Sequence, residues 1–145
     1  MKVFCDTNVL VAAFLQNHPH HHSARPVVER VKAGQDQGFV AAHSLAEAYA
    51  VLTRLPGNNH VAPTVAWQLI SENVLRSFAI ITLTAKEYAQ ALEKAANEGV
   101  EGGRTYDVLL LASGVNSGAE RIYTMNVRHF QSLTDEKLRA RITAP

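Results

Sequence analysis

The chain has 145 residues, of which 47% are hydrophobic and 19% are charged. This length suits one domain that can bury a sizeable core, and this composition excludes a disordered chain. The formal net charge is only +1, with the histidines counted as neutral. Bulk charge therefore does not indicate nucleic-acid binding, and any site for a polyanion must be local.

The single cysteine, Cys5, lies in an apolar stretch. No internal disulfide can form, and the thiol is most simply a small buried hydrophobe. No run approaches the ~18 apolar residues of a membrane span, and no apolar signal region precedes Asp6. We therefore expect a soluble, unexported protein in a reducing cytoplasm.

An apolar strand over residues 2–5 leads into Asp6-Thr7-Asn8 and then into a helix that ends near Gln16. In an open parallel sheet, ligands collect at the carboxyl ends of the strands, so Asp6 is a candidate for the centre of an active site. Asp is also a common N-cap, and Asp6 has a second interpretation as the cap of the following helix.

Four histidines crowd the turn over residues 17–23, and a helix runs from about His20 to Gly34. Zinc binding at this turn would require a second ligand cluster at matching spacing, which the sequence lacks. The favoured interpretation is a solvated loop and helix start.

Residues 38–42 predict a short second strand, and a helix opening at His43-Ser44 carries Glu47 at the edge of its apolar face. Because Glu is a good helix former, an ordinary solvated Glu47 is the competing interpretation. Residues 63–76 predict a helix with proline at its first position. Residues 78–83 are the clearest strand, a β-branched run typical of strands buried on both faces.

Thr84 and Glu87 predict a capping box for the next helix. A later helix, starting near Thr105, places Asp107 on its apolar stripe, where an unpaired charge is costly unless a cation or hydrogen bonds meet it. The helix dipole offers a purely structural reason for an acid in the first turn.

A fourth strand over residues 121–124 leads to Asn126, so a polar side chain again follows a strand end. The tail from Thr134 is helical and charged, with a short edge strand at residues 141–143. Strands alternating with helices predict an α/β domain with a mainly parallel sheet and right-handed crossovers.

On that fold, Asp6 and Asn126 lie just beyond strand ends at the same edge, and the helices of Glu47 and Asp107 follow loops at or near it. Carboxylates this close need a counter-charge, and oxygen ligands favour a hard cation such as Mg²⁺ or Mn²⁺. Such a site lowers the pKa of bound water and stabilises the charge of a phosphodiester under attack.

These segments together resemble the four motifs of PIN domains, in the order and approximate spacing of VapC-type toxins of type II toxin-antitoxin systems. The matching segments are Asp6-Thr7-Asn8, the helix of Glu47, Tyr106-Asp107 and residues 124–130. The resemblance spans nearly the whole chain, taken as a single domain over residues 1–145. It implies a PIN-like three-layer α/β/α sandwich with about five parallel strands, Mg²⁺-dependent endoribonuclease activity, homodimerisation and inhibition by a cognate VapB-type antitoxin.

By position, the resemblance implies a metal site made of Asp6, Glu47 and Asp107, with Asn8 and Thr124 as supporting polar groups. Asn126 completes the catalytic set, but it stands where many family members have a fourth Asp. A neutral amide donates no charge, which argues against a tightly bound second metal ion.

Arg104 and Arg128 flank two of the motifs and are expected to contact RNA phosphates, ordinary surface arginines being the alternative. A phosphoacceptor receiver domain shares the fold class but needs an acidic pair after the first strand, an Asp after a central strand and a late Lys, which are absent. A non-catalytic RNA-binding or interaction module remains the second interpretation.

Overall fold

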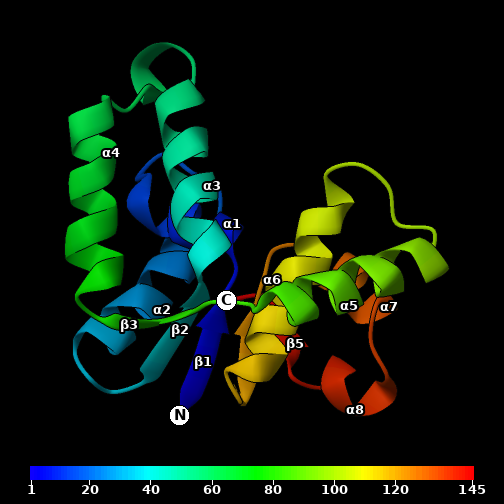
Figure 1. Cartoon of the computed structure of the whole chain (residues 1–145). Helices are drawn as coiled ribbons and strands as arrows, with labels where there is room; N and C mark the ends of the chain where they lie inside the picture. Colours follow the sequence, from blue (N-terminus) through cyan, green and yellow to red (C-terminus); the bar gives the residue numbers. More distant parts are fainter.

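A fully parallel, five-stranded sheet organises the chain in the computed structural model, which describes residues 1–145 (Figure 1). The strands lie in the order β3-β2-β1-β4-β5. Their bounds are β1 Lys2–Cys5, β2 Gln37–Ala41, β3 Phe78–Ile81, β4 Arg121–Tyr123 and β5 Ile142–Thr143. The predicted α/β fold, with a mainly parallel sheet of about five strands, is confirmed.

Helices connect the strands and cover both faces of the sheet. The α-helices are α1 Thr7–Phe14, α2 His21–Lys32, α3 Ala42–Arg54, α4 Pro63–Ile70, α5 Ala85–Asn97, α6 Arg104–Asn116, α7 Val127–Ser132 and α8 Glu136–Arg139. A 3₁₀ turn, η1 (Gly57–Asn59), precedes α4, and a π-helical turn, η2 (Ser71–Leu75), follows it. The predicted capping box at the start of α5 is present, formed by Thr84 and Glu87.

The side chains of β1 alternate between two apolar cores, as expected for a strand covered on both faces. Val3 and Cys5 pack with the buried side of α1 and α2. Phe4 points to the other face and packs with the apolar run Val108–Leu111 of α6. The sheet lies between these two cores, and helices cover each core from outside, which gives the three layers of the α/β/α sandwich.

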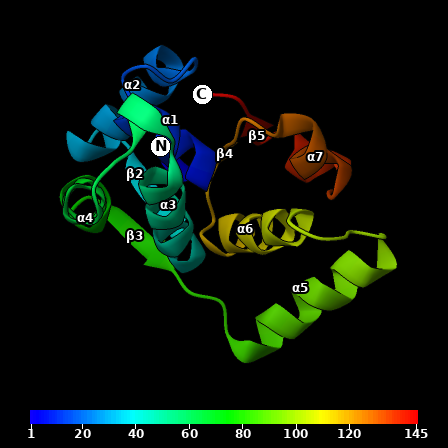
Figure 2. The same cartoon turned by 90° about the horizontal axis from the view of Figure 1, so that it is seen from above.

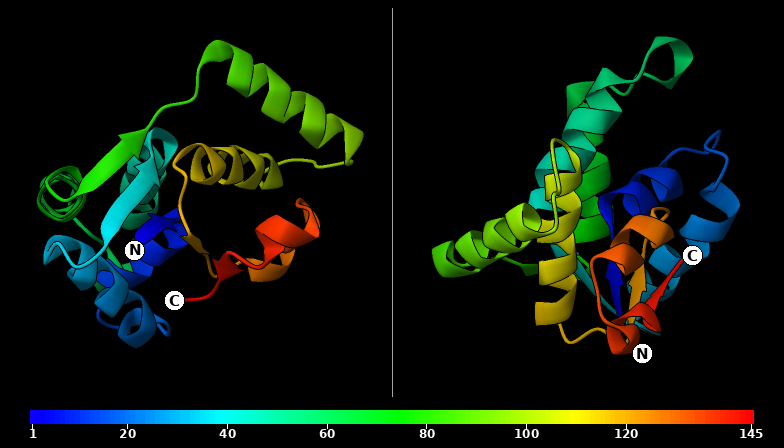
Figure 3. Two further views of the ribbon diagram at one scale, coloured as in Figure 1. Left: turned by 90° about the horizontal axis from the view of Figure 1, so that it is seen from below. Right: turned by 90° about the vertical axis from the view of Figure 1, so that its right-hand side faces the viewer.

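Helices α3 and α4 lie side by side and extend beyond the sheet (Figure 1). They share a smaller core in which Ala48 and Leu52 of α3 meet Ala66 and Ile70 of α4. Helix α5 lies on the outside of the molecule, next to α6, as the views from above and below show (Figures 2 and 3). Helices α3 and α4 therefore lie on one side of the carboxyl edge of the sheet, and α5 lies on the other.

Two elements differ from the sequence prediction. The expected strand over residues 78–83 is shorter and lies at the edge of the sheet, where Ala79 is exposed rather than buried on both faces. The predicted helix over residues 63–76 widens into the π turn after Ile70, and both Ile70 and Val74 are buried. Neither strand order nor a π turn is visible in apolar periodicity, which records only the face that each residue buries.

Gly38 in β2 is the most tightly packed glycine of the chain, and it provides a test of the packing. A Cβ atom added at Gly38 would lie 2.4 Å from Val31 Cγ1 and 2.6 Å from Phe78 Cδ1, both in buried side chains. We expect Gly38→Ala to lower the free energy of unfolding by roughly 1–3 kcal/mol through overpacking. Gly103→Ala, where a Cβ meets nothing within 4 Å, is the matched control. Equal melting temperatures for the two variants would contradict this packing.

Candidate active site

Asp6 lies at the point where β1 ends and α1 begins. The parallel register pairs Cys5 with Tyr123 of β4, and the Asp6 amide donates to the Tyr123 carbonyl at 2.9 Å. Asp6 occupies the N-cap position of α1, yet its side chain makes no capping hydrogen bond. Its Oδ2 atom instead accepts a 2.6 Å hydrogen bond from the Thr124 hydroxyl. The structural interpretation of Asp6 as a helix cap is therefore not supported.

The Asp6 carboxyl is buried, with only 2% of the residue exposed. Burial raises the pKa of Asp6 from its usual 3.8 to about 7. The carboxylates of Asp107 and Glu47 push the pKa in the same direction, whereas hydrogen bonds from Thr124 and the Thr7 backbone oppose the rise. Asp107 of α6 and Glu47 of α3 thus lie near enough to repel the carboxylate of Asp6 at the end of β1.

Asp107 is in the first turn of α6 and is paired with a histidine from α7. Nδ1 of His129 lies 2.5 Å from Oδ2 of Asp107, and both side chains are 18% exposed. The sequence predicts that an unpaired Asp107 carboxylate on the apolar stripe would be costly, and this hydrogen bond supplies the partner that it needs. Because α7 begins directly after the Asn126 loop, the pair joins two of the predicted motif segments.

Glu47, on α3, also has a histidine neighbour one helical turn away. Nε2 of His43 lies 3.0 Å from Oε2 of Glu47, a distance typical of an ion pair. The orientation does not make a hydrogen bond, so Oε2 is a buried oxygen without a hydrogen-bond partner. Such an orphaned acceptor is costly unless another group satisfies it.

Supporting polar groups hold the strand ends together. Oδ1 of Asn8 accepts from the Met125 amide at 3.1 Å, and this bond ties the start of α1 to the loop after β4. The Thr7 hydroxyl donates to Ser44 Oγ at 2.9 Å and ties the same turn to α3. Thr124 is fully buried, and its Oγ1 atom also accepts from the Asn126 amide at 3.0 Å.

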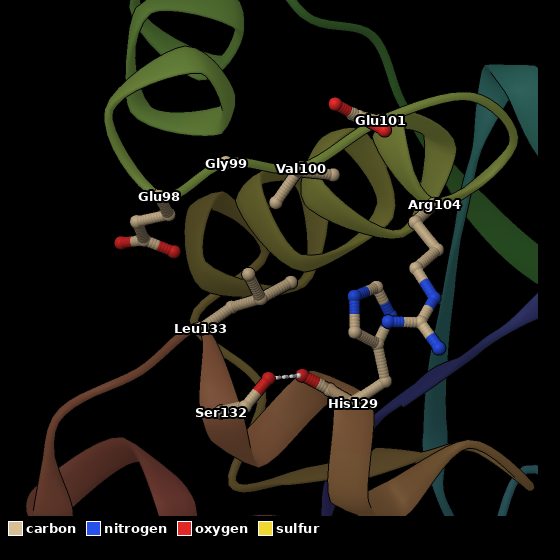
Figure 4. A pocket seen from close by; sticks show the side chains of 8 residues that line it. All are labelled: Glu98, Gly99, Val100, Glu101, Arg104, His129, Ser132 and Leu133. Atoms are coloured by element: carbon tan, nitrogen blue, oxygen red, sulfur yellow. Dashed lines mark hydrogen bonds between the residues drawn. The ribbon is translucent and has the colours of Figure 1, made fainter.

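The remaining predicted residues surround the acids on the surface. Asn126 is exposed at the N-cap of α7. Arg128 follows it, and both line a hollow of about 450 Å³ together with His129. Arg104 lines a second pocket, of about 690 Å³, and its guanidinium lies beside the His129 ring (Figure 4). Both arginines are exposed, as phosphate-contacting residues must be.

The acids are not assembled into a ligand set as they stand. No three His, Cys, Asp or Glu side chains lie close enough together to hold a metal ion. Instead, Asp107 is hydrogen-bonded to His129, and His43 is the nearest charged-type neighbour of Glu47. The histidine turn is structurally mixed: His21 is buried, and its Nδ1 lies 3.0 Å from the Ala12 carbonyl oxygen.

Sequence reasoning missed His43 and His129 as members of the site. The sequence indicates His43 only as the opening of a helix, although its spacing of four residues from Glu47 is a signal that the two side chains meet. Nothing local connects His129 with Asp107, which lies 22 positions earlier in the chain. That contact depends on α6 and α7 packing together.

The sequence matches the family model of the PIN domain over residues 3–135. This match spans most of the chain and includes every predicted site residue. The chain therefore belongs to the PIN domain family.

Within that family, the similar curated proteins are VapC ribonucleases. Ribonuclease VapC40 of Mycobacterium tuberculosis is 32% identical over 137 residues, which cover 94% of each chain. Ribonuclease VapC27 of the same species is 28% identical over 79% of this chain and 78% of its own. The predicted resemblance to VapC-type PIN ribonucleases is thus confirmed. Ribonucleases of this family generally depend on a divalent metal ion.

Solved structures share the fold. VapC20 of Mycobacterium tuberculosis, described as a toxin that cleaves the sarcin-ricin loop, matches with a TM-score of 0.70 at 18% identity over 90% of this chain and 94% of its own. VapBC2 of Rickettsia felis, solved with a DNA fragment from its promoter, matches with a TM-score of 0.61 at 20% identity over 88% and 90%. None of the helices described above has the length and apolarity needed to cross a membrane.

The raised pKa of Asp6 predicts a pH-dependent stability of the metal-free protein. Between about pH 4 and pH 7, the folded protein holds a proton that the unfolded chain has lost, so stability falls as pH rises through this window. Asp6→Asn carries no charge and should exceed the wild type in stability at pH 8. This difference in the free energy of unfolding should be smaller by roughly 2–3 kcal/mol at pH 5, because each unit of pKa shift corresponds to about 1.36 kcal/mol. Melting curves in chelator at both pH values measure the gap, and a constant difference would contradict the buried, crowded carboxyl.

Proposed function

We propose that this protein is a divalent-metal-dependent endoribonuclease and the toxin of a VapBC-type toxin-antitoxin module. The observation that carries the proposal is the burial of Asp6 within the repulsive range of Asp107 and Glu47, at the carboxyl edge of a parallel sheet. A carboxylate kept there without a cationic partner is a cost to the fold, and such costs are typical of functional sites.

The three acids fit a hard divalent cation by their chemistry. All offer oxygen ligands, which Mg²⁺ and Mn²⁺ prefer, and Oε2 of Glu47 is a buried acceptor with no hydrogen-bond partner. We assign Asp6, Glu47 and Asp107 as the ligands, with Asn126 as a secondary, uncharged group. When bound, such a cation lowers the pKa of a coordinated water and stabilises negative charge on the phosphate under attack.

The surrounding residues position these ligands. The Thr124 hydroxyl fixes one Asp6 oxygen and leaves Oδ1 free of that bond. Asn8 fixes the loop that carries Asn126, because its side chain holds the Met125 amide. His129 orients Asp107 in the metal-free protein, and His43 lies beside Glu47, so both acids would have to turn towards Asp6 to bind one ion together.

RNA is the substrate that the site and its surroundings favour. Arg104 and Arg128 are exposed on either side of His129, where their cations can contact phosphates next to the acids. They supply the local positive charge that the near-neutral chain lacks in bulk. An enzyme that hydrolyses cellular RNA is expected to act in the cytoplasm.

Two protein partners follow from the proposed module. A VapB-type antitoxin is the expected inhibitor, supported by the fold shared with the toxin of the VapBC2 complex. A second copy of this chain is the other expected partner, since exposed apolar side chains such as Trp67, Val65 and Leu92 remain on the outer helices.

Removal of one ligand charge should abolish cleavage without unfolding the chain. We expect Asp6→Asn, Glu47→Gln and Asp107→Asn to lower the Mg²⁺-dependent cleavage rate at least about 100-fold, because metal stabilisation of the reacting phosphate is worth several kcal/mol. Glu93→Gln, at an exposed position of α5, is the matched control and should cleave as the wild type does. Excess chelator should stop cleavage, and added Mg²⁺ or Mn²⁺ should restore it.

The outcome also decides between the proposal and its alternative. A non-catalytic RNA-binding module is favoured by the neutral Asn126 and by the separation of the acids. RNA binding without any metal-dependent cleavage by the wild-type protein would establish that alternative.

Asn126 tests how charge at the edge of the site controls metal binding. Asn126→Asp adds a carboxylate and should raise metal affinity, so activity at limiting Mg²⁺ increases while activity at saturating Mg²⁺ changes little. Asn126→Ala should lower turnover but not eliminate it. A Mg²⁺ titration of the cleavage rate compares both variants with the wild type. An unchanged Mg²⁺ requirement for Asn126→Asp, or complete inactivity of Asn126→Ala, would show that Asn126 is not a secondary ligand.

A further inference from the structure

A third pocket lies on the α3 side of the acids, away from the two hollows that His129 lines. Its volume is about 550 Å³, and it is formed by one stripe of α3 together with the start of α6. Glu47 lines it, so the pocket opens directly beside a proposed ligand. Apart from Glu47, no side chain in its wall belongs to the predicted catalytic or RNA-contacting set.

The wall of this pocket contains a stacked pair of rings. His43 and Tyr106 are nearly parallel, with ring centroids 4.8 Å apart and an interplanar angle of 15°. Tyr106 is 49% exposed although it lies in the first turn of α6. An exposed ring held rigid by a second ring presents a flat surface at little cost in side-chain entropy.

The rest of the pocket offers apolar contact and one cation. Ala46, Ala50 and Val51 form an apolar strip along α3, beside Glu47 and from there towards the end of the helix. Arg54 closes the strip, is exposed, and lies seven residues after Glu47, or about 10 Å along the helix axis. A ring, an apolar floor and a terminal cation match a nucleotide, whose base is flat and apolar on its faces and whose phosphate is anionic.

Tyr106 lies between this pocket and the pocket that Arg104 and His129 line. Arg104 and Asp107 are three residues apart and lie on the side of α6 that meets His129. Tyr106 lies between them in sequence and points to the other side, towards His43. The first turn of α6 therefore divides two pockets that flank the acids, as required for an RNA strand that crosses the site.

We propose that the Tyr106–His43 pocket binds a nucleobase of the RNA strand next to the cleaved phosphodiester, with the base stacked on Tyr106 and a neighbouring phosphate held by Arg54. This inference rests on the proposed ribonuclease function and adds a subsite to it. Arg104 and Arg128 contact the strand on the other side of the acids. Base preference is then set by the space between Tyr106 and the apolar strip of α3.

The test compares the affinity for a polymer that has bases and phosphates with the affinity for one that has phosphates alone. Fluorescence anisotropy in chelator measures the affinity for a pool of single-stranded RNA 12-mers and for linear polyphosphate, which has no bases. Tyr106→Leu should weaken RNA binding about fivefold or more, since base stacking on an aromatic ring contributes that much, and should leave polyphosphate binding unchanged. Tyr106→Phe keeps the ring and should bind RNA as the wild type does. Tyr88→Leu, at an exposed tyrosine of α5, is the matched control.

Arg54→Gln should weaken binding of both polymers and reduce the salt dependence of RNA affinity by about one phosphate contact, whereas Tyr106→Leu should leave that slope intact. Equal RNA affinity of Tyr106→Leu and the wild type would overturn the subsite. So would a loss of polyphosphate binding by Tyr106→Leu equal to its loss of RNA binding. Cleavage of total bacterial RNA with Mg²⁺ is measured in parallel. If the wild type cleaves and Tyr106→Leu still binds normally, only the subsite fails; if the wild type neither binds nor cleaves RNA, the ribonuclease proposal fails as well.

Discussion

The burial of one carboxyl group, that of Asp6, is the constraint on which the rest of the site depends. The strand β1 is covered on both faces, so the residue that follows it is buried as well. Desolvation and two neighbouring carboxylates raise the pKa of Asp6 to about 7. The fold tolerates this group because Thr124 donates to it, and the uncompensated negative charge is what a cation can use. Stability and function therefore compete at this position.

Each of the other two acids has a histidine neighbour. His129 holds Asp107, and His43 lies against Glu47 while also stacking on Tyr106. In the metal-free protein these contacts reduce the cost of crowding three carboxylates. The same contacts link the acids to the two flanking pockets, because each histidine also lines one of them. The charge of the site and the surfaces proposed to bind RNA are thus parts of one connected set of side chains.

Much of this arrangement could be predicted from the sequence. The strand that ends at Cys5, the polar groups after it and the capping box at Thr84 follow from local periodicity and turn chemistry. The place of Asp6 and Asn126 at one sheet edge follows from parallel strands alone. The edge position of β3 and the pairing of His129 with Asp107 do not, since they depend on strand order and on packing between helices far apart in the chain. The exposure of Tyr106, which suggested the base pocket, is equally a property of the folded chain.

The metal site can be tested with a crystal of the protein grown with Mn²⁺ and measured for anomalous scattering. We expect a manganese peak at the carboxyl end of β1, with oxygens of Asp6, Asp107 and Glu47 in its first coordination sphere or one water away, at roughly 2 Å for direct ligands. Asp107 should then have turned from His129 towards the ion. A structure at saturating Mn²⁺ in which Asp107 keeps its histidine partner and no manganese lies near Asp6 would show that these acids do not form a metal site.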